Sequence, residues 1–103
     1  MKRLHVAATL LCTFALASAS AFAAGDPAAG KAKAGSCAGC HGANGEGKGA
    51  NPPLAGMDPA KFVQAIKDYK SGKRVNAPMK SMTANLSEAD CDNLAAYYAS
   101  LKK

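Results

Sequence analysis

The sequence lacks tryptophan and is poor in other aromatic residues, with three Tyr and three Phe among 103 residues. Negative charge is also scarce, because seven Asp and Glu stand against thirteen Lys and Arg and leave a formal charge of +6. No stretch alternates apolar and polar residues as a half-buried strand does. These shortages predict one small, basic, all-α domain. A domain with so small a core often needs covalent cross-links or a cofactor to be stable.

The N-terminus has the pattern of a signal peptide, predicted to cover residues 1–23. Met1–Arg3 is basic, Leu4–Leu16 is apolar, and Ala21–Ala23 is a small-x-small cleavage site. An uncleaved membrane anchor is the alternative, weakened because the apolar stretch is rich in Ala and Ser. Cleavage near Ala23 would remove two basic residues, lower the net charge to +4 and deliver the remaining domain to the periplasm.

Disulfide bonds are not predicted to stabilise this domain. Cys12 belongs to the predicted signal peptide, which leaves Cys37, Cys40 and Cys91 in the remaining chain. An odd number argues against a disulfide framework, although an exported protein could form one. Cys91 falls on the apolar face of a predicted helix and is interpreted as a small buried hydrophobe. The alternative is an exposed thiol that pairs with another subunit.

The stretch Cys37-Ala38-Gly39-Cys40-His41 is the pattern of covalent haem attachment. Each thiol can add across one haem vinyl group to form a thioether, and His41 can then ligate the iron. The sequence therefore predicts one covalently bound haem c in a single domain, residues 24–103. Cys37 and Cys40 are its predicted cofactor-binding residues and His41 is a predicted metal ligand.

Capping signals predict three principal helices. An Asp-Pro pair opens each of the first two, because Asp caps a helix and proline suits its first turn. Ser87 with Asp90 three residues later resembles the capping box of a third. The predicted helical segments are Ala28–Ser36, Pro59–Ser71 and a last helix that begins after Ser87.

The first of these helices has small residues where another helix could approach. Gly30 and Ala34 predict that the N- and C-terminal helices cross. Residues 72–78 are predicted to be a loop, and Met79–Asn85 at most a short helical turn. The glycine-rich stretch 42–51 is predicted to be a flexible loop that runs past the cofactor.

A second axial ligand is needed if the iron is to carry electrons without binding a substrate. Methionine is a common partner of histidine in such sites. His41 is the only histidine after the predicted signal peptide, which excludes two histidines from one chain. Met57 lies too near the His41 side of the haem. From spacing alone, Met79 and Met82 are equal candidates.

The order of several motifs resembles the small bacterial class I cytochromes c, a periplasmic monohaem family with His/Met ligation. The matching stretches are Cys37–Gly42, Pro-x-Leu-Ala-Gly at 52–56, Gly-Lys-Arg at 72–74, Met79 eight residues before Ser87, and Leu-Ala-Ala-Tyr at 94–97. The resemblance implies a small cytochrome c fold packed around the haem.

The same resemblance implies roles for three further residues. Met79 would be the second iron ligand, beside His41. The carbonyl of Pro52 would accept a hydrogen bond from His41 Nδ1–H, as a ligating imidazole requires. Arg74 is a candidate contact for a haem propionate.

The predicted function is one-electron transfer between redox proteins, with no catalytic residue and no enzymatic activity of its own. Partners with acidic docking surfaces are expected, because basic side chains are predicted to border the haem edge. These are Lys48, Lys73, Arg74 and Lys80. An equally simple interpretation is that they only keep the protein soluble. The chain is expected to act as a monomer or as a subunit of a heteromeric complex, and to meet a membrane only through its partners.

Several other functions could use the same residues. One is a haem subunit of a larger enzyme, such as a flavoprotein that oxidises sulfide. A thiol–disulfide oxidoreductase would need a sheet-containing fold, and an open-site haem enzyme or gas sensor would need Met79 away from the iron. A zinc site would use the adjacent Cys40 and His41, which chelate one ion poorly. Gly42–Lys48 resembles a phosphate-binding loop but lacks its Ser or Thr, so neither nucleotide nor nucleic acid is predicted as a ligand.

Overall fold

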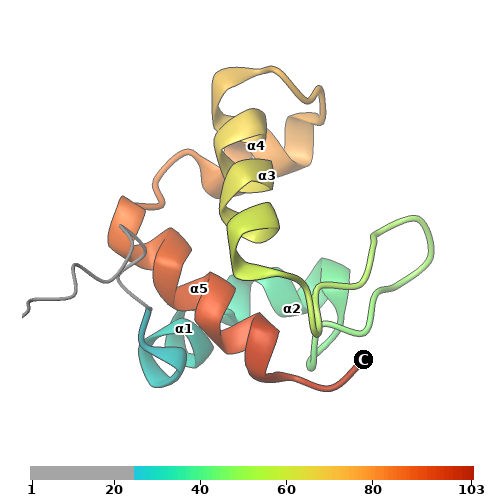
Figure 1. The fold of residues 1–103 in the computed structure, drawn as a ribbon. Helices are drawn as coiled ribbons and strands as arrows, with labels where there is room; N and C mark the ends of the chain where they lie inside the picture. The colour runs from blue at the N-terminus through green and yellow to red at the C-terminus, as the bar shows by residue number, and fades with distance from the viewer. Residues whose placement is uncertain (1–24) are drawn as a thin grey trace, which may run out of the picture.

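The computed structural model describes residues 25–103, and the predicted signal peptide lies outside them. The described chain is all-α, which confirms the predicted fold class (Figure 1). Its extended pairing is confined to one isolated bridge between Lys48 and Asn51. The helices are α1 (Pro27–Lys33), α2 (Gly35–His41), α3 (Pro59–Ser71), α4 (Ala77–Thr83) and α5 (Glu88–Ser100).

The N- and C-terminal helices of the described chain, α1 and α5, lie against each other, as predicted (Figure 1). Gly30 of α1 lies at a close contact between them. A Cβ atom placed on Gly30 would lie 2.0 Å from the Asn93 carbonyl oxygen of α5, far inside van der Waals contact. Only glycine fits this contact, because any side chain would have to push the two backbones apart.

The core lies where α3 crosses α5. Phe62 and Ile66 of α3 are buried against Leu94 and Tyr98 of α5, and the Phe62 and Tyr98 rings stack with centroids 5.6 Å apart. Tyr69, three residues after Ile66, is only half-buried near the end of the helix. The cluster is small, as the shortage of aromatic residues predicted.

The predicted caps are present. Asp26 accepts from Ala28 N–H, Asp58 accepts from Ala60 N–H, and Ser87 forms a reciprocal capping box with Asp90. These contacts satisfy backbone donors that a helix leaves unpaired at its start. They place the beginnings of α1, α3 and α5 where the sequence predicted them.

Two segments differ from prediction. The expected first helix is two helices, because the chain turns at Ala34 before α2 begins. Residues 77–83 form α4, longer and earlier than the expected short turn. The Asn76 side chain accepts from Met79 N–H and so caps α4, while Pro78 lies within its first turn. Pro78, interpreted as part of a loop, is thus a helix-starting residue.

Candidate functional site

The complete Cys-x-x-Cys-His motif lies on α2. Cys37 is half-buried and Cys40 is exposed, and both are free thiols. Residues three apart on a helix lie on neighbouring positions of its surface. The two thiols are therefore presented together, and His41 is the last residue of the same helix.

The His41 ring is buried, with 6% of the residue exposed, and its orientation is fixed by one backbone contact. His41 Nδ1 lies 2.8 Å from the Pro52 carbonyl oxygen. A carbonyl can only accept, so Nδ1 carries the proton and donates it. In the neutral imidazole this leaves Nε2 as the nitrogen that can ligate a metal ion. This is the contact that the family resemblance implied.

The loop that carries Pro52 is held to the end of α2 by backbone hydrogen bonds. Gly47 N–H donates to the His41 carbonyl at 2.7 Å, and the N–H groups of Leu54 and Ala55 both donate to the Gly45 carbonyl, at 2.7 and 2.9 Å. Gly45 and Gly47 have φ of 66° and 89°, which other residues rarely adopt. The glycines thus shape a hydrogen-bonded support for the histidine, not the flexible loop that the sequence suggested.

Met79 and Met82 both lie on α4, but they differ in exposure. Met79 is half-buried, whereas 47% of Met82 is exposed. The backbone of Met79 is held at both ends, by Asn76 at its N–H and by the Thr83 hydroxyl, which donates to its carbonyl at 2.8 Å. Met79 also lies near His41, an arrangement consistent with both residues ligating one iron.

Met57 is in a different environment. It follows the glycine-rich loop and packs, half-buried, against the core cluster around Phe62 and Tyr98. Its packing is that of a core residue.

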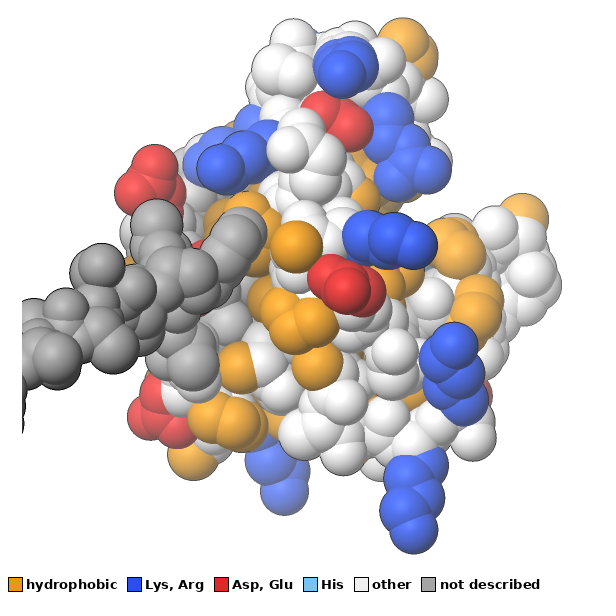
Figure 2. Space-filling model, viewed as in Figure 1, with side chains coloured by type: hydrophobic (Ala, Val, Ile, Leu, Met, Phe, Trp, Pro, Cys, Tyr) orange, Lys and Arg blue, Asp and Glu red, His pale blue; other side chains and the backbone are white. Residues whose placement is uncertain are grey.

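Three of the four basic residues predicted to border the haem edge lie together. Lys73, Arg74 and Lys80 are all exposed, and a Cβ placed on Gly72 would be 4.0 Å from Lys80 Nζ. Lys48 belongs to the separate glycine-rich loop. Figure 2 shows that Lys and Arg side chains are spread widely over the face in view, with Asp and Glu among them.

The Arg74 guanidinium has a protein partner. Its central carbon lies 5.2 Å from the centroid of the Tyr69 ring, a cation–π arrangement. The Arg74 N–H also donates to the Asp68 carbonyl at 3.1 Å, which ties the segment after α3 back to that helix. Contact of Arg74 with a haem propionate stays a prediction.

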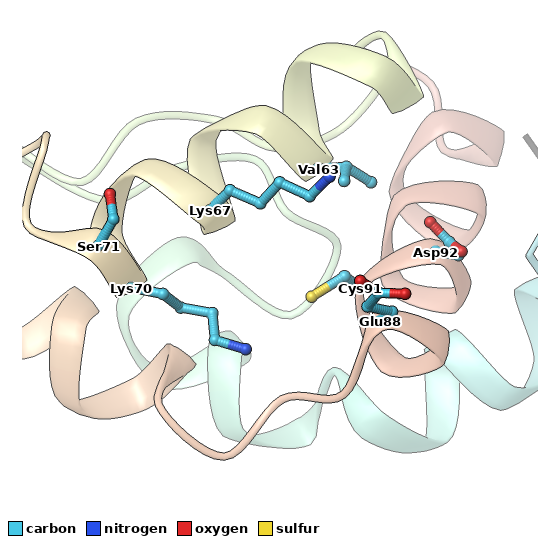
Figure 3. A pocket seen from close by; sticks show the side chains of 7 residues that line it. All are labelled: Val63, Lys67, Lys70, Ser71, Glu88, Cys91 and Asp92. Carbon is cyan, nitrogen blue, oxygen red and sulfur yellow. The ribbon is translucent and has the colours of Figure 1, made fainter.

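Cys91 lies apart from this site, in an open groove of about 480 Å³ between α3 and α5. Figure 3 shows Lys67 and Lys70 of α3 across the groove from Cys91. Cys91 is only 5% exposed, and burial raises the pKa of its thiol. A buried, protonated thiol is unreactive. These properties fit the interpretation of Cys91 as a small buried hydrophobe.

Residues 25–103 contain no cluster of three or more His, Cys, Asp and Glu side chains that could hold a metal ion. Within the same residues, no helix is long and apolar enough to cross a membrane.

The residues on α2, α4 and the glycine-rich loop fit a covalently bound haem. Two free thiols are available for thioethers, Nε2 of His41 is available for iron, and a half-buried methionine sulfur offers a soft second ligand. The sequence did not reveal that Cys37 packs, half-buried, against the core cluster that contains Tyr98.

Comparison with known proteins also indicates a haem-binding domain. Residues 27–102 match the family model described as Cytochrome c. Cytochrome c4 of Pseudomonas aeruginosa is 44% identical over 95 residues, which are 91% of this chain and 47% of that protein. Cytochrome c-554(547) of Halothiobacillus neapolitanus is 41% identical in an alignment 91 residues long that covers 77% of this chain and 100% of that protein.

The fold has a counterpart among solved structures. The structure of cytochrome c4 from Acidithiobacillus ferrooxidans superposes with a TM-score of 0.71 and 32% identity, over 73% of this chain and 49% of that one. The chain thus spans about half the length of the cytochromes c4 that it matches.

Proposed function

Because the chain belongs to the cytochrome c family, which comprises electron carriers and not catalytic enzymes, we propose that it transfers single electrons by means of one covalent haem c. The observation that supports this most directly is the His41–Pro52 hydrogen bond of 2.8 Å, which leaves Nε2 free to ligate iron. When bound, the haem supplies an iron that cycles between the ferrous and ferric states.

Each part of the chain has a separate task in this proposal. Cys37 and Cys40 hold the cofactor through thioethers, and the Pro52 carbonyl keeps the imidazole of His41 in one tautomer and one orientation. Met79 provides the second ligand from a helix whose first turn is capped by Asn76. With the iron held by His41 and Met79, no substrate would need to bind, and little rearrangement would accompany electron transfer.

The choice between Met79 and Met82 gives a sharp test. Replacing Met79 with leucine is expected to abolish the weak red ferric absorption band of an iron–methionine bond and to lower the reduction potential, because leucine cannot ligate. Leucine keeps the apolar volume, so the helix should remain folded. The measurement is the visible spectrum of the purified haem protein, oxidised and reduced.

Met82→Leu is the matched control, since it makes the same change one turn later on α4. It should keep the band and the potential of the unaltered protein. If Met82→Leu loses the band and Met79→Leu keeps it, the ligand has been assigned to the wrong methionine. If both variants keep it, neither sulfur ligates the iron.

We also propose that the protein works in the periplasm after cleavage near Ala23. The support is the basic, apolar and small-x-small sequence of residues 1–23 together with membership of a family that is typically periplasmic. Intact mass measurement of the protein from the periplasmic fraction tests this. A mass that still includes residues 1–23 would contradict cleavage.

Electrostatic attraction to an acidic redox partner is proposed from the exposed Lys73, Arg74 and Lys80. The rate of reduction by an acidic partner protein should fall several-fold as salt rises from about 0.01 M to about 0.15 M, because the screening length shrinks from about 30 Å to about 8 Å. Stopped-flow kinetics measures this rate.

The matched variants for this prediction are Lys80→Gln and Lys31→Gln. Each removes one exposed charge, from α4 and from α1 respectively. Lys80→Gln should weaken the salt dependence more than Lys31→Gln. Equal effects, or a rate independent of salt, would mean that the basic residues near α4 serve solubility alone.

A further inference from the structure

His41 and Thr83 are the two buried polar side chains of residues 25–103. Thr83, the last residue of α4, is the more deeply buried, with 1% of the residue exposed. A buried hydroxyl is unfavourable unless it forms a hydrogen bond. The Thr83 hydroxyl donates to the Met79 carbonyl at 2.8 Å and reaches the Lys80 carbonyl at a longer 3.4 Å. The hydrogen bond of each buried polar side chain thus involves a proposed iron ligand.

Thr83 lies on the same face of α4 as Met79. The two residues are four apart, and residues at this spacing lie one above the other on a helix. Met79 and Thr83 are also the two residues of α4 that are not exposed. A single fully buried side chain therefore anchors α4 to the rest of the molecule, and it is one helical turn away from the proposed ligand.

Thr83 also connects the end of α4 to the core. Its backbone carbonyl accepts from Leu86 N–H at 3.1 Å. Leu86 packs, partly buried, against the core cluster, and its carbonyl accepts from Lys70 Nζ of α3 at 2.7 Å. A continuous path of contacts therefore runs from the core and α3, through Thr83, to the backbone of Met79.

The backbone of Met79 has to be fixed if its sulfur is to stay in one place, because methionine has several rotatable side-chain bonds. Asn76 holds the Met79 N–H and Thr83 holds the Met79 carbonyl. The Asn76 side chain is exposed, so water competes for its bond, whereas the hydroxyl of Thr83 is buried and its bond is correspondingly stronger.

We infer that Thr83 is a positioning residue for the second iron ligand, whose hydroxyl holds the Met79 carbonyl and thereby slows release of the Met79 sulfur from the iron. This inference rests on the proposed function, because it requires a haem iron ligated by Met79. It gives the methionine side of the site a counterpart to the Pro52 carbonyl, which orients His41 on the other side.

Thr83→Val tests the inference, because valine has nearly the shape of threonine but lacks the hydroxyl. Imidazole added to the oxidised haem protein replaces the methionine, and at saturating imidazole the rate is limited by release of the sulfur. We expect this limiting rate, followed by stopped-flow absorbance, to rise about three- to tenfold, as loss of one hydrogen bond predicts. Without imidazole, the ferric band of the methionine ligand should be retained.

A second pair of variants isolates the hydroxyl again. Thr83→Ser keeps it and Thr83→Ala removes it, so the limiting rate of Thr83→Ala should exceed that of Thr83→Ser by a similar factor. This comparison decides the question alone if Thr83→Val does not bind haem. Ser81→Ala is the matched control, since it removes an exposed hydroxyl from the same helix and should leave the rate unchanged.

Three results would overturn the inference. The first is a limiting rate in Thr83→Val equal to that of the unaltered protein, and the second is equal rates in Thr83→Ala and Thr83→Ser. The third is loss of haem or fold in Thr83→Ser, since the methyl group would then be the essential part of the side chain. Failure of the proposed function is recognised beforehand, because the unaltered protein would lack covalent haem or the ferric methionine band.

Discussion

Replacing both Cys37 and Cys40 with alanine is expected to abolish covalent haem attachment completely. Alanine cannot form a thioether, and the chain would then have only two non-covalent axial ligands for the cofactor. Without a large apolar cofactor to pack against, the small core around Tyr98 and Leu94 should also lose much of its stability. The measurement is intact mass under denaturing conditions, which should lack the added mass of one haem.

Cys91→Ala is the matched control, because it removes the third thiol of the described chain and leaves α2 unchanged. It should retain one covalent haem. Since Cys91 is buried, the substitution should cost about 1 kcal/mol of unfolding free energy through lost packing. A Cys91→Ala protein without haem would contradict the assignment of attachment to α2 alone.

Replacing Gly30 with alanine is expected to reduce the unfolding free energy by about 3 kcal/mol. In an unhindered helix the same change would raise the unfolding free energy by about 1 kcal/mol. Here the new methyl carbon would lie 2.0 Å from the Asn93 carbonyl oxygen and 2.7 Å from the Tyr97 Cβ atom, so α1 and α5 must separate. Chemical denaturation of the haem protein, followed by circular dichroism, measures the loss.

Gly35→Ala is the control for this prediction. Gly35 is the first residue of α2, and a Cβ placed there meets no atom within 4 Å. The substitution should leave stability unchanged or raise it by up to about 1 kcal/mol. If Gly30→Ala were as stable as Gly35→Ala, the close contact of α1 with α5 would not exist in the folded protein.

The features that were predicted correctly from sequence alone depend on contacts between residues close together in the chain. The Asp58 and Ser87 caps bond to backbone groups two or three residues away, so their positions could be recognised without any tertiary information. The spacing of Cys37 and Cys40 was enough to predict that they act together, although the helix that carries both, α2, was not predicted. Where the chemistry is local, residue type and spacing were sufficient.

Other features required the fold. Asn76 caps a helix that begins at Ala77, where the sequence had predicted a loop up to Pro78 and at most a short helical turn after it. Gly45 and Gly47 looked like a flexible segment, yet their backbone groups bind Ala55 and His41. Glycine permits both disorder and tight turns, so only the surrounding contacts distinguish them.

The sequence by itself determined that two thiols and a histidine lie together on one basic, helical domain, and that a methionine would have to complete the iron site. It left Met79 and Met82 equal until a family resemblance was considered. The tertiary structure decided which methionine is half-buried, brought the Pro52 carbonyl to His41 Nδ1, and packed Cys37 against the core cluster. The reason is physical: a ligand's identity depends on its own side chain, whereas its orientation and burial depend on residues distant in sequence that only packing brings together.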